Sequence, residues 1–201
     1  MHLRPVFAET DQARIKLLIR DNPFGLLITA GARPEATHIP FVLEEREDGF
    51  VLSGHLAAGN PQCAALDGPA LAVFGGPHAY ISPSWYLTQP AVPTWDYAAV
   101  HVSGRLRPLE EEEEIARALR TLGAHDPGFD LDALPEKFRQ AMLAGIRAFT
   151  LTPERVEAQW KMSQNRSAAD RKSVMAALRG QGEPLAAEVA DLIAATLPGA
   201  A

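Results

Sequence analysis

The sequence is poor in cysteine. Cys63 is the single cysteine among 201 residues, so the chain can form no internal disulfide and no cysteine-rich metal site. The histidines His55, His78 and His101 follow neither HxH nor HExxH spacing, which leaves a metal site without support. A chain that needs no disulfide fits a reducing compartment, and we expect a cytoplasmic protein that binds no metal.

Long apolar runs and common catalytic motifs are also missing. No stretch is long enough to cross a bilayer, and the opening residues MHLRPVFAET lack the charged start and apolar run of a signal peptide. The sequence contains no GxSxG, no Walker loop and no GxGxxG. We therefore expect no membrane partner, and neither a hydrolase nucleophile elbow nor a P-loop.

Positive charge is in deficit. Lys and Arg total 19 against 25 Asp and Glu, which gives a net charge of −6 and a pI near 5.5. DNA-binding proteins usually carry an excess of basic residues, and the sequence shows no helix-turn-helix with a basic recognition helix. The densest basic cluster is formed by Lys161, Arg166, Arg171 and Lys172. Within it, the stretch NRSAADRK (165–172) is the one candidate contact for DNA.

Apolar residues are present in ordinary amounts, and their spacing predicts a mixed order of elements. Hydrophobic residues make up 47% of the chain, and the length fits one domain over residues 1–201. The predicted strands lie at 24–30, 35–43, 50–55, 69–76, 78–82 and 97–109, followed by a strand in two pieces at 147–162 around Pro153. The predicted helices lie at 11–21 with Thr10 as N-cap, 61–66, 110–125, 135–146, 167–180 and 183–197. The last two are the predicted C-terminal helices, which together cover about 167–198.

The turn residues complete this prediction. Asp48-Gly49 marks a hairpin, and Gly104 inside a strand marks a bend or bulge. Strands and helices do not alternate regularly. We therefore expect an α+β fold, an antiparallel β-barrel with peripheral helices and a helical C-terminal end.

The segment SGHLAAGNPQ (53–62) is a candidate phosphate site. A strand ends there and a helix begins at Asn60-Pro61, so free N–H groups and the helix dipole favour an anion. His55 and Asn60 can add side-chain hydrogen bonds. The alternative is an ordinary capped helix beside a surface histidine.

Aromatic residues gather in one segment, HAYISPSWYLTQPAVPTWDY (78–97). It contains all three tyrosines and two of the three tryptophans, Trp85 and Trp95. Several such rings in one proline-broken loop suit the wall of a planar ligand or a subunit interface. The alternative is a loop anchored by its own aromatic side chains.

A third candidate is WKMSQNRSAADRK (160–172), where hydrogen-bonding residues precede a helix. The amides of Gln164 and Asn165 carry both donors and acceptors, which suits the edge of a heteroaromatic ring. The alternative is a polar turn between a strand and a helix.

Four motifs, found in order, resemble those of the PaiB-like, FMN-binding "negative transcriptional regulator" family. They are HLAAGNPQ (55–62), FGGPHAYISPSWY (74–86), VPTWDYAAVHVSG (92–104) and KMSQNR (161–166), and the resemblance covers nearly the whole chain. It implies the split β-barrel of pyridoxamine-phosphate-oxidase-like proteins, which are homodimers that bind one FMN per subunit at the dimer interface.

The same resemblance implies which residues bind FMN. His55, Ala58 and Asn60 occupy the turn that holds the phosphate, and the aromatic loop borders the flavin and the partner subunit. Gly59 departs from the expected small or basic residue, so the phosphate would depend more on the backbone. The implied cofactor-binding residues are Thr37, His38, His55, Ala58, Asn60, Trp85, Trp95, Lys161, Ser163, Gln164 and Asn165.

Three functions stay open at this point. The family label implies a regulator that represses genes, such as those for degradative enzymes or sporulation, or a flavin-based redox sensor. The same pocket suits a flavin oxidoreductase that passes hydride from NAD(P)H or a small substrate, although no side chain is visibly a required acid or base. The third is a split barrel that binds haem, with His55 or His101 on iron, or no ligand.

Overall fold

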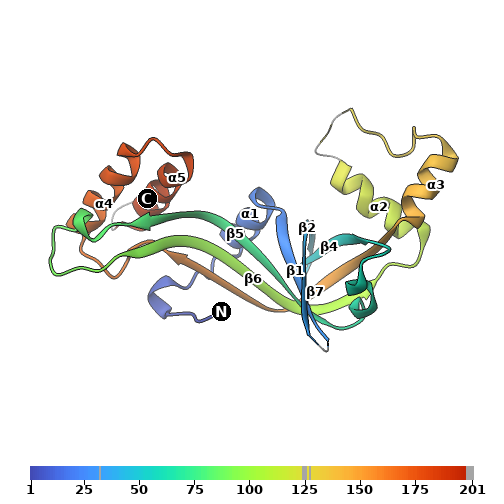
Figure 1. The fold of residues 1–201 in the computed structure, drawn as a ribbon, viewed down its shortest axis with the longest axis horizontal. Helices are drawn as coiled ribbons and strands as arrows, with labels where there is room; N and C mark the ends of the chain where they lie inside the picture. The colour runs from blue at the N-terminus through green and yellow to red at the C-terminus, as the bar shows by residue number, and fades with distance from the viewer. Residues whose placement is uncertain (32, 124–125, 127, 198–201) are drawn as a thin grey trace. The chain divides into compact units, whose positions relative to one another are not determined.

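The computed structural model describes residues 1–31, 33–123, 126 and 128–197, and the described part is built on one seven-stranded sheet (Figure 1). The strands are β1 (Phe24–Ala30), β2 (Pro34–Pro40), β3 (Val42–Arg46), β4 (Gly49–Ala57), β5 (Pro69–Ile81), β6 (Thr94–Pro108) and β7 (Ile146–Lys161). The α-helices are α1 (Gln12–Asp21), α2 (Glu112–Gly123), α3 (Glu136–Ala144), α4 (Ala168–Gly180) and α5 (Pro184–Ala195). Three 3-10 turns are η1 (Pro5–Phe7), η2 (Pro61–Ala65) and η3 (Pro83–Trp85).

The sheet is antiparallel, with the order β2-β1-β5-β6-β7-β4-β3. Its edge strands are β2 and β3, and the sheet does not close into a full barrel. The predicted fold class, an α+β split β-barrel with peripheral helices, is confirmed. The predicted hairpin at Asp48-Gly49 is also confirmed, because β3 and β4 pair from Val42↔Ser53 to Arg46↔Gly49. Gly49 has a φ of +142°, a conformation that favours glycine.

The chain divides into two compact units, and β5, β6 and β7 each contribute to both. The first unit comprises Met1–Ile15, Gly75–Val100 and Glu157–Ala201, and the second comprises Lys16–Phe74 and His101–Val156. The prediction of a single domain over residues 1–201 stays a prediction. Among the described residues, no helix is both long and apolar enough to cross a membrane.

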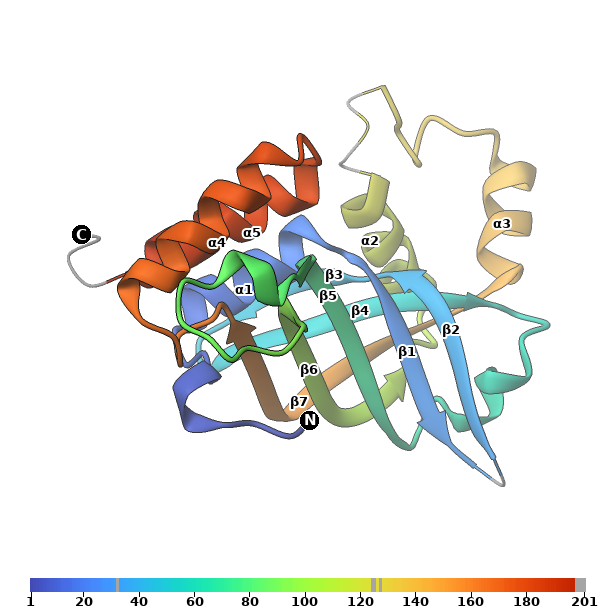
Figure 2. The same cartoon turned by 60° about the vertical axis from the view of Figure 1, so that its left-hand side comes forward.

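The core of the first unit includes the packed pair α4 and α5, which lie side by side in both views (Figures 1 and 2). Val174 and Leu178 of α4 and Val189 and Ile193 of α5 are fully buried. The green loop that carries η3 lies beside α4 in both views, and the Thr88 N–H donates to the Asp170 carboxylate at 2.9 Å. This bond fixes the β5–β6 connection to the C-terminal helices.

The core of the second unit is aromatic and aliphatic. The Phe41 ring meets Phe74 edge-on at 5.2 Å and Phe149 at 6.4 Å between centroids. The predicted strand 35–43 is interrupted at Phe41, where the backbone N–H donates to the Pro23 carbonyl at 2.8 Å. Burial of the Phe41 ring therefore divides one predicted strand into β2 and β3.

Two other predicted breaks are wrong, because β5 and β7 are each continuous. The two predicted pieces 69–76 and 78–82 join in β5 across Pro77, and β7 runs through Pro153. Near Pro153, the absence of a side chain at Gly104 lets two strands approach closely, since a Cβ there would lie 2.0 Å from the Thr152 carbonyl oxygen.

The first helix has a different N-cap from the predicted one. The Asp11 side chain, not that of Thr10, accepts the Ala13 N–H at 2.8 Å. The Thr10 and Asp11 N–H groups both donate to the Glu9 carboxylate at 2.9 Å. A carboxylate one residue later therefore caps the helix, as the preference for Asp at this position allows.

Candidate functional site

The predicted cofactor residues fall into two groups, one in each unit. The second unit holds Thr37, His38, His55, Ala58 and Asn60. The first unit holds Trp85, Trp95, Lys161, Ser163, Gln164 and Asn165.

In the second unit, Thr37 and Asn60 form one hydrogen-bond network with Gln62, which the sequence did not single out. The Thr37 hydroxyl donates to Gln62 Oε1 at 2.7 Å and accepts from Asn60 Nδ2 at 3.1 Å. Gln62 is 1% exposed, and its amide donates to the carbonyls of Leu27 and Glu35. The network fastens the turn after β4 to the β1–β2 hairpin.

The turn after β4 differs from the predicted helix start. Asn60 caps it as expected, because its side chain accepts the Gln62 N–H at 2.9 Å. The segment that follows is the five-residue 3-10 turn η2, which is too short to carry a substantial helix dipole. Any phosphate bound here therefore depends on side-chain donors and single N–H groups.

The remaining residues of this group lie on the same elements. His55, on β4, is half-buried, and burial lowers the pKa of its imidazole, which favours the neutral form at neutral pH. The Ala58 N–H donates to the Gly145 carbonyl at 2.9 Å. His38 is exposed on β2 and stacks on Phe24, with 5.8 Å between ring centroids.

Open hollows of about 380 and 430 Å³ lie beside this network. Both are lined by Arg33, Glu35 and Gln62, and the larger one also by Thr37 and Asn60. The Arg33 guanidinium, which lies 3.6 Å from Glu35, is a cation at this site that the sequence reading missed.

In the first unit, the aromatic segment is a hairpin, and the loop within it is shorter than predicted because β6 begins at Thr94 and not at Tyr97. Tyr80 lies on β5 and Trp95 and Tyr97 on β6, so only Trp85 and Tyr86 belong to the connection. Trp95 is 54% exposed, and its ring lies 6.1 Å from Tyr80 and 6.2 Å from His78 between centroids. We call His78, Tyr80 and Trp95 the aromatic surface.

Pairing of β5 and β6 explains this surface. Residues two apart along a strand face the same side, so His78 and Tyr80 are both exposed while Ala79 and Ile81 are buried. The neighbouring strand then presents Trp95 to the same two rings. Sequence clustering of aromatics found this surface, but only strand register decides which rings meet.

The predicted side chains of the KMSQNR motif are mostly engaged by their own chain. The Lys161 ammonium donates to Thr94 Oγ1 and the Trp95 carbonyl. The Gln164 amide accepts the Met162 N–H at 2.7 Å and donates to the Trp160 carbonyl at 2.6 Å. These contacts build the turn that follows β7.

Asn165 and Arg166 differ from the earlier residues of the motif in their surroundings. Asn165 is exposed. The Arg166 guanidinium lies over the Tyr86 ring, 4.4 Å from its centroid, and forms no ion pair within the described part of the chain. The side chains of this turn that face outward are therefore an amide and a cation.

The basic cluster predicted as a DNA contact is dispersed. Arg171 is buried, and its guanidinium donates to the Ile193 carbonyl and to the Thr196 hydroxyl. Lys161 is held by β6. Lys172 is exposed, and Arg166 is half-buried.

Asp96 is the residue of this region that sequence reasoning missed. It is fully buried on β6, and its Oδ2 accepts from the Ser163 hydroxyl at 2.6 Å. Its Oδ1 lies 3.6 Å from the Lys161 Nζ but has no hydrogen-bond partner among the residues described. Burial raises the pKa of this carboxyl, and the Ser163 hydrogen bond and the Lys161 charge only partly oppose that effect.

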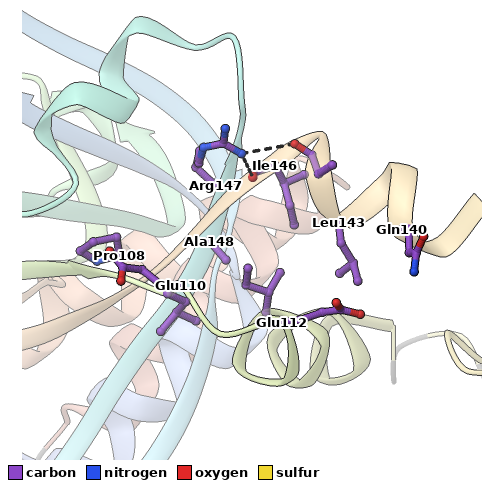
Figure 3. Close-up of a pocket in the computed structure, with 11 residues that line it drawn as sticks. Pro108, Glu110, Glu112, Gln140, Leu143, Ile146, Arg147 and Ala148 are labelled. Carbon is purple, nitrogen blue, oxygen red and sulfur yellow. Dashed lines mark hydrogen bonds between the residues drawn. The ribbon is translucent and has the colours of Figure 1, made fainter.

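A further open hollow of about 560 Å³ lies in the second unit (Figure 3). One of its lining residues, Ala148 of β7, pairs with His55 of β4. Its lining includes the apolar side chains of Leu109, Leu143 and Ala148 and the carboxylate of Glu112. Arg147 donates to the carbonyls of Ala144 and Ile146 and so closes the end of α3. In the described ranges, no group of three or more His, Cys, Asp or Glu residues is placed to hold a metal ion.

The fold is that of split-barrel flavin-binding proteins. The flavocytochrome Anf3 from Azotobacter vinelandii matches with a TM-score of 0.62 and 14% identity, over 79% of this chain and 72% of that one. The FAD and haem binding protein from Mycobacterium smegmatis matches with a TM-score of 0.61 and 16% identity, over 83% and 78%. At these identities the likeness shows the fold alone.

Sequence comparison identifies the family within this fold. Residues 1–155 match the family model described as "Putative FMN-binding domain", and the chain belongs to that family. It is also 35% identical over 200 residues to the protease synthase and sporulation protein PAI 2 of Bacillus subtilis, with 96% of each chain covered. The predicted resemblance and the predicted cofactor, FMN, are thereby confirmed. The KMSQNR turn lies beyond residue 155, outside the family match.

Proposed function

We propose that this protein is an FMN-binding homodimer of the PaiB type in which the aromatic surface contacts the flavin ring. The carrying observation is that an FMN-binding family member exposes a tryptophan, a tyrosine and a histidine together on β5 and β6. Aromatic faces stack on planar heterocycles, and each ring offers a large area at low entropic cost. Trp85, Ser163, Gln164 and Asn165 are proposed to contribute to the same ligand.

As a separate proposal, which concerns the second unit alone, we assign a phosphate to the turn after β4. Thr37 and Asn60 line an open hollow there, His55 lies on the strand that leads into the turn, and Arg33 adds a positive charge. Gly59 adds no side chain to this turn, and among the residues described no atom lies within 4 Å of the position that a Cβ would take there, so the turn is open at this point. The Ala58 N–H is already donated to the Gly145 carbonyl. His38, which follows Thr37 on β2, is proposed to contact either the flavin ring or the phosphate.

The two assignments are tested separately by titrating the protein with FMN and with riboflavin, which lacks the phosphate. Trp95→Ala is expected to lower the affinity for both ligands by about tenfold, which corresponds to the loss of one stacking contact. Asn60→Ala is expected to weaken FMN while leaving riboflavin unchanged. The matched control is Phe138→Ala, because Phe138 is also 54% exposed but lies on α3. Equal FMN affinity in Trp95→Ala and the native protein would overturn the ring assignment.

The homodimer is proposed from the same surface. Leu87 and Val92, in the connection between β5 and β6, are also exposed, so the same hairpin presents further apolar side chains. Sedimentation velocity is expected to give about 43 kDa, twice the 21.7 kDa of one chain. A monomer both with and without FMN would contradict the proposal.

Regulation is the role that we propose for the flavin-bound protein, by analogy with the relative named for protease synthesis and sporulation. The dispersed basic cluster and the net charge of −6 disfavour DNA binding driven by charge alone. A gel shift with promoter fragments at two salt concentrations distinguishes the cases, because charge-driven binding is lost at the higher salt. Binding that survives higher salt would support direct regulation.

The alternative is a flavin oxidoreductase, and one observation favours it. Asp96, a carboxyl whose pKa is raised, directly follows Trp95 on β6, so a group that can change protonation lies behind the proposed ring surface. FMN supplies the redox chemistry, and the chain binds and orients it. Anaerobic bleaching of bound FMN by NADPH or NADH at catalytic rates would favour the enzyme, and no bleaching would exclude these donors.

A further inference from the structure

The backbone at Trp95 is held by the side chain of Lys161. The Lys161 ammonium donates to the Trp95 carbonyl and to Thr94 Oγ1, and lies 3.6 Å from the Asp96 carboxylate. An ammonium group has three N–H donors. Lys161 therefore directs its charge at three consecutive residues of β6, with Trp95 in the middle.

The turn that places Lys161 is itself held by Asp96. Ser163 has a φ of +55°, a conformation that non-glycine residues rarely adopt, and its hydroxyl donates to Asp96 Oδ2 at 2.6 Å. The Tyr86 hydroxyl lies 3.4 Å from the Ser163 hydroxyl on its other side. Strained residues persist only where their surroundings over-determine them, which is the case here.

The Asp96 carboxylate lacks the partners that a structural ion pair would normally have. It is 0% exposed, yet Oδ1 has no hydrogen bond within the described part of the chain. The Nε of Arg171, a buried residue on α4, also has no hydrogen bond within the described part of the chain. The Arg171 guanidinium interacts electrostatically with Asp96. A buried charge left partly unsatisfied lowers stability, so replacing it by an apolar residue would usually be favourable.

We infer that Asp96 is a positioning residue: through Lys161 and Ser163, its carboxylate fixes the backbone of residues 94–96 and thereby the Trp95 indole on the aromatic surface. The link to FMN rests on the proposed function, whereas the clamp on Trp95 does not. The charged or titratable groups that face Asp96 are Lys161 from β7, Arg171 from α4 and, through Ser163, Tyr86 from the β5–β6 connection. Protonation of Asp96 removes the charge that holds Lys161, so the clamp loosens on acidification.

The test uses protein labelled with 5-fluorotryptophan and studied by fluorine NMR without FMN. The chain has three tryptophans, and Trp95→Phe assigns the resonance of Trp95. In the otherwise native protein that resonance is expected to shift with pH in an acid titration. In Asp96→Asn it is expected to start from a different position and to lose this titration. Glu157→Gln is the matched control, because Glu157 is a buried acid of the same unit, paired with the N-terminal amine at 2.9 Å.

Two further variants separate other causes. His78 also lies near the Trp95 ring, and the titration assigned to Asp96 is expected to persist in His78→Gln. Ser163→Gly keeps the positive φ without strain but removes the hydroxyl, so it is expected to move the Trp95 resonance in the same direction as Asp96→Asn. If Asp96→Asn does not fold, Ser163→Gly decides the question. A Trp95 resonance unchanged in both position and pH profile would overturn the inference.

A fluorescence titration with FMN then connects the clamp to the ligand. Asp96→Asn is expected to lower the affinity for FMN by about tenfold, which is comparable to the loss of one charge-assisted hydrogen bond. Glu157→Gln is expected to bind FMN as the native protein does. Equal FMN affinity in Asp96→Asn and native protein would overturn the link to the ligand. If the native protein binds no FMN at all, the proposed function fails, whereas the NMR result still decides whether Asp96 positions Trp95.

Discussion

The side chains of Thr37 and Gln62, 25 residues apart in the sequence, are joined by a 2.7 Å hydrogen bond. Through it the turn after β4 is tied to β2, and the buried Gln62 amide extends the connection to the Leu27 and Glu35 carbonyls. The proposed phosphate site therefore depends on Gln62 for its structure, although the buried Gln62 side chain is not available to bind the ligand.

Replacing Gln62 by Leu is expected to destabilise the protein by about 2–4 kcal/mol, because several buried polar groups lose their partner at once. Urea unfolding monitored by circular dichroism measures the change in the free energy of unfolding. The control is Gln140→Leu on α3, where the side chain is exposed and, among the residues described, bonds only Glu136. A change of less than about 0.5 kcal/mol in Gln62→Leu, the range of surface substitutions, would contradict the importance of the network.

Asp96 makes stability depend on pH in a defined direction. Burial raises the pKa of its carboxyl above the usual 3.8, so between 3.8 and the raised value the folded chain binds more protons than the unfolded chain. Stability then falls as pH rises through that window, by about 1.4 kcal/mol per unit of pKa difference. The measurement is the free energy of unfolding from pH 4 to 8 in native protein and Asp96→Asn. The variant is expected to lack this component, and parallel curves would show that the carboxyl does not titrate in the window.

The pKa of the Glu45 carboxyl is shifted in the opposite direction from that of Asp96. Hydrogen bonds from Arg20 at 2.6 Å and Lys16 at 2.8 Å lower the pKa of this exposed carboxyl to about 2. Its contribution to stability is therefore present above pH 4.5 and is lost as pH falls toward 2. Carbon-13 NMR of the carboxyl group is expected to show this low midpoint, which Arg20→Gln should move toward 4.5. A midpoint that stays low in the variant would mean that Arg20 is not the main cause.

Gly104 is expected to tolerate no side chain. In Gly104→Ala the new Cβ would lie 2.0 Å from the Thr152 carbonyl oxygen, so β6 and β7 must separate. We expect destabilisation of about 3 kcal/mol or more, as for overpacking against backbone, or failure to fold. Gly75→Ala is the matched control on β5, because no atom of the described part of the chain lies within 4 Å of a Cβ at that position. Thermal unfolding followed by circular dichroism compares the two, and similar midpoints would refute the expected clash.

Much of the local structure could be predicted because it depends on neighbouring residues. The strand at Phe24–Ala30 has the predicted bounds, and Asn60 caps the turn that was expected after β4. The errors lie where distant residues decide the local conformation. Pro153 reads as a strand break, yet β7 continues through it beside Gly104 of β6.

The candidate site shows the same division. Clustering of aromatic residues was visible in the sequence, but the contact of Trp95 with Tyr80 and His78 follows from the pairing of β5 with β6. Asp96 gave no signal in the sequence, because an aspartate between a tryptophan and a tyrosine looks like any polar strand residue. Its importance depends on complete burial, which only packing of the whole unit establishes.

By itself, the sequence determined the antiparallel α+β fold, the FMN-binding family and the segments that carry the candidate ligand residues, because apolar periodicity, turn residues and long motifs are properties of contiguous stretches. The tertiary structure alone decided which polar side chains remain available. Thr37 and Lys161 are engaged by partners in their own chain, and such hydrogen bonds form between residues that only folding brings together.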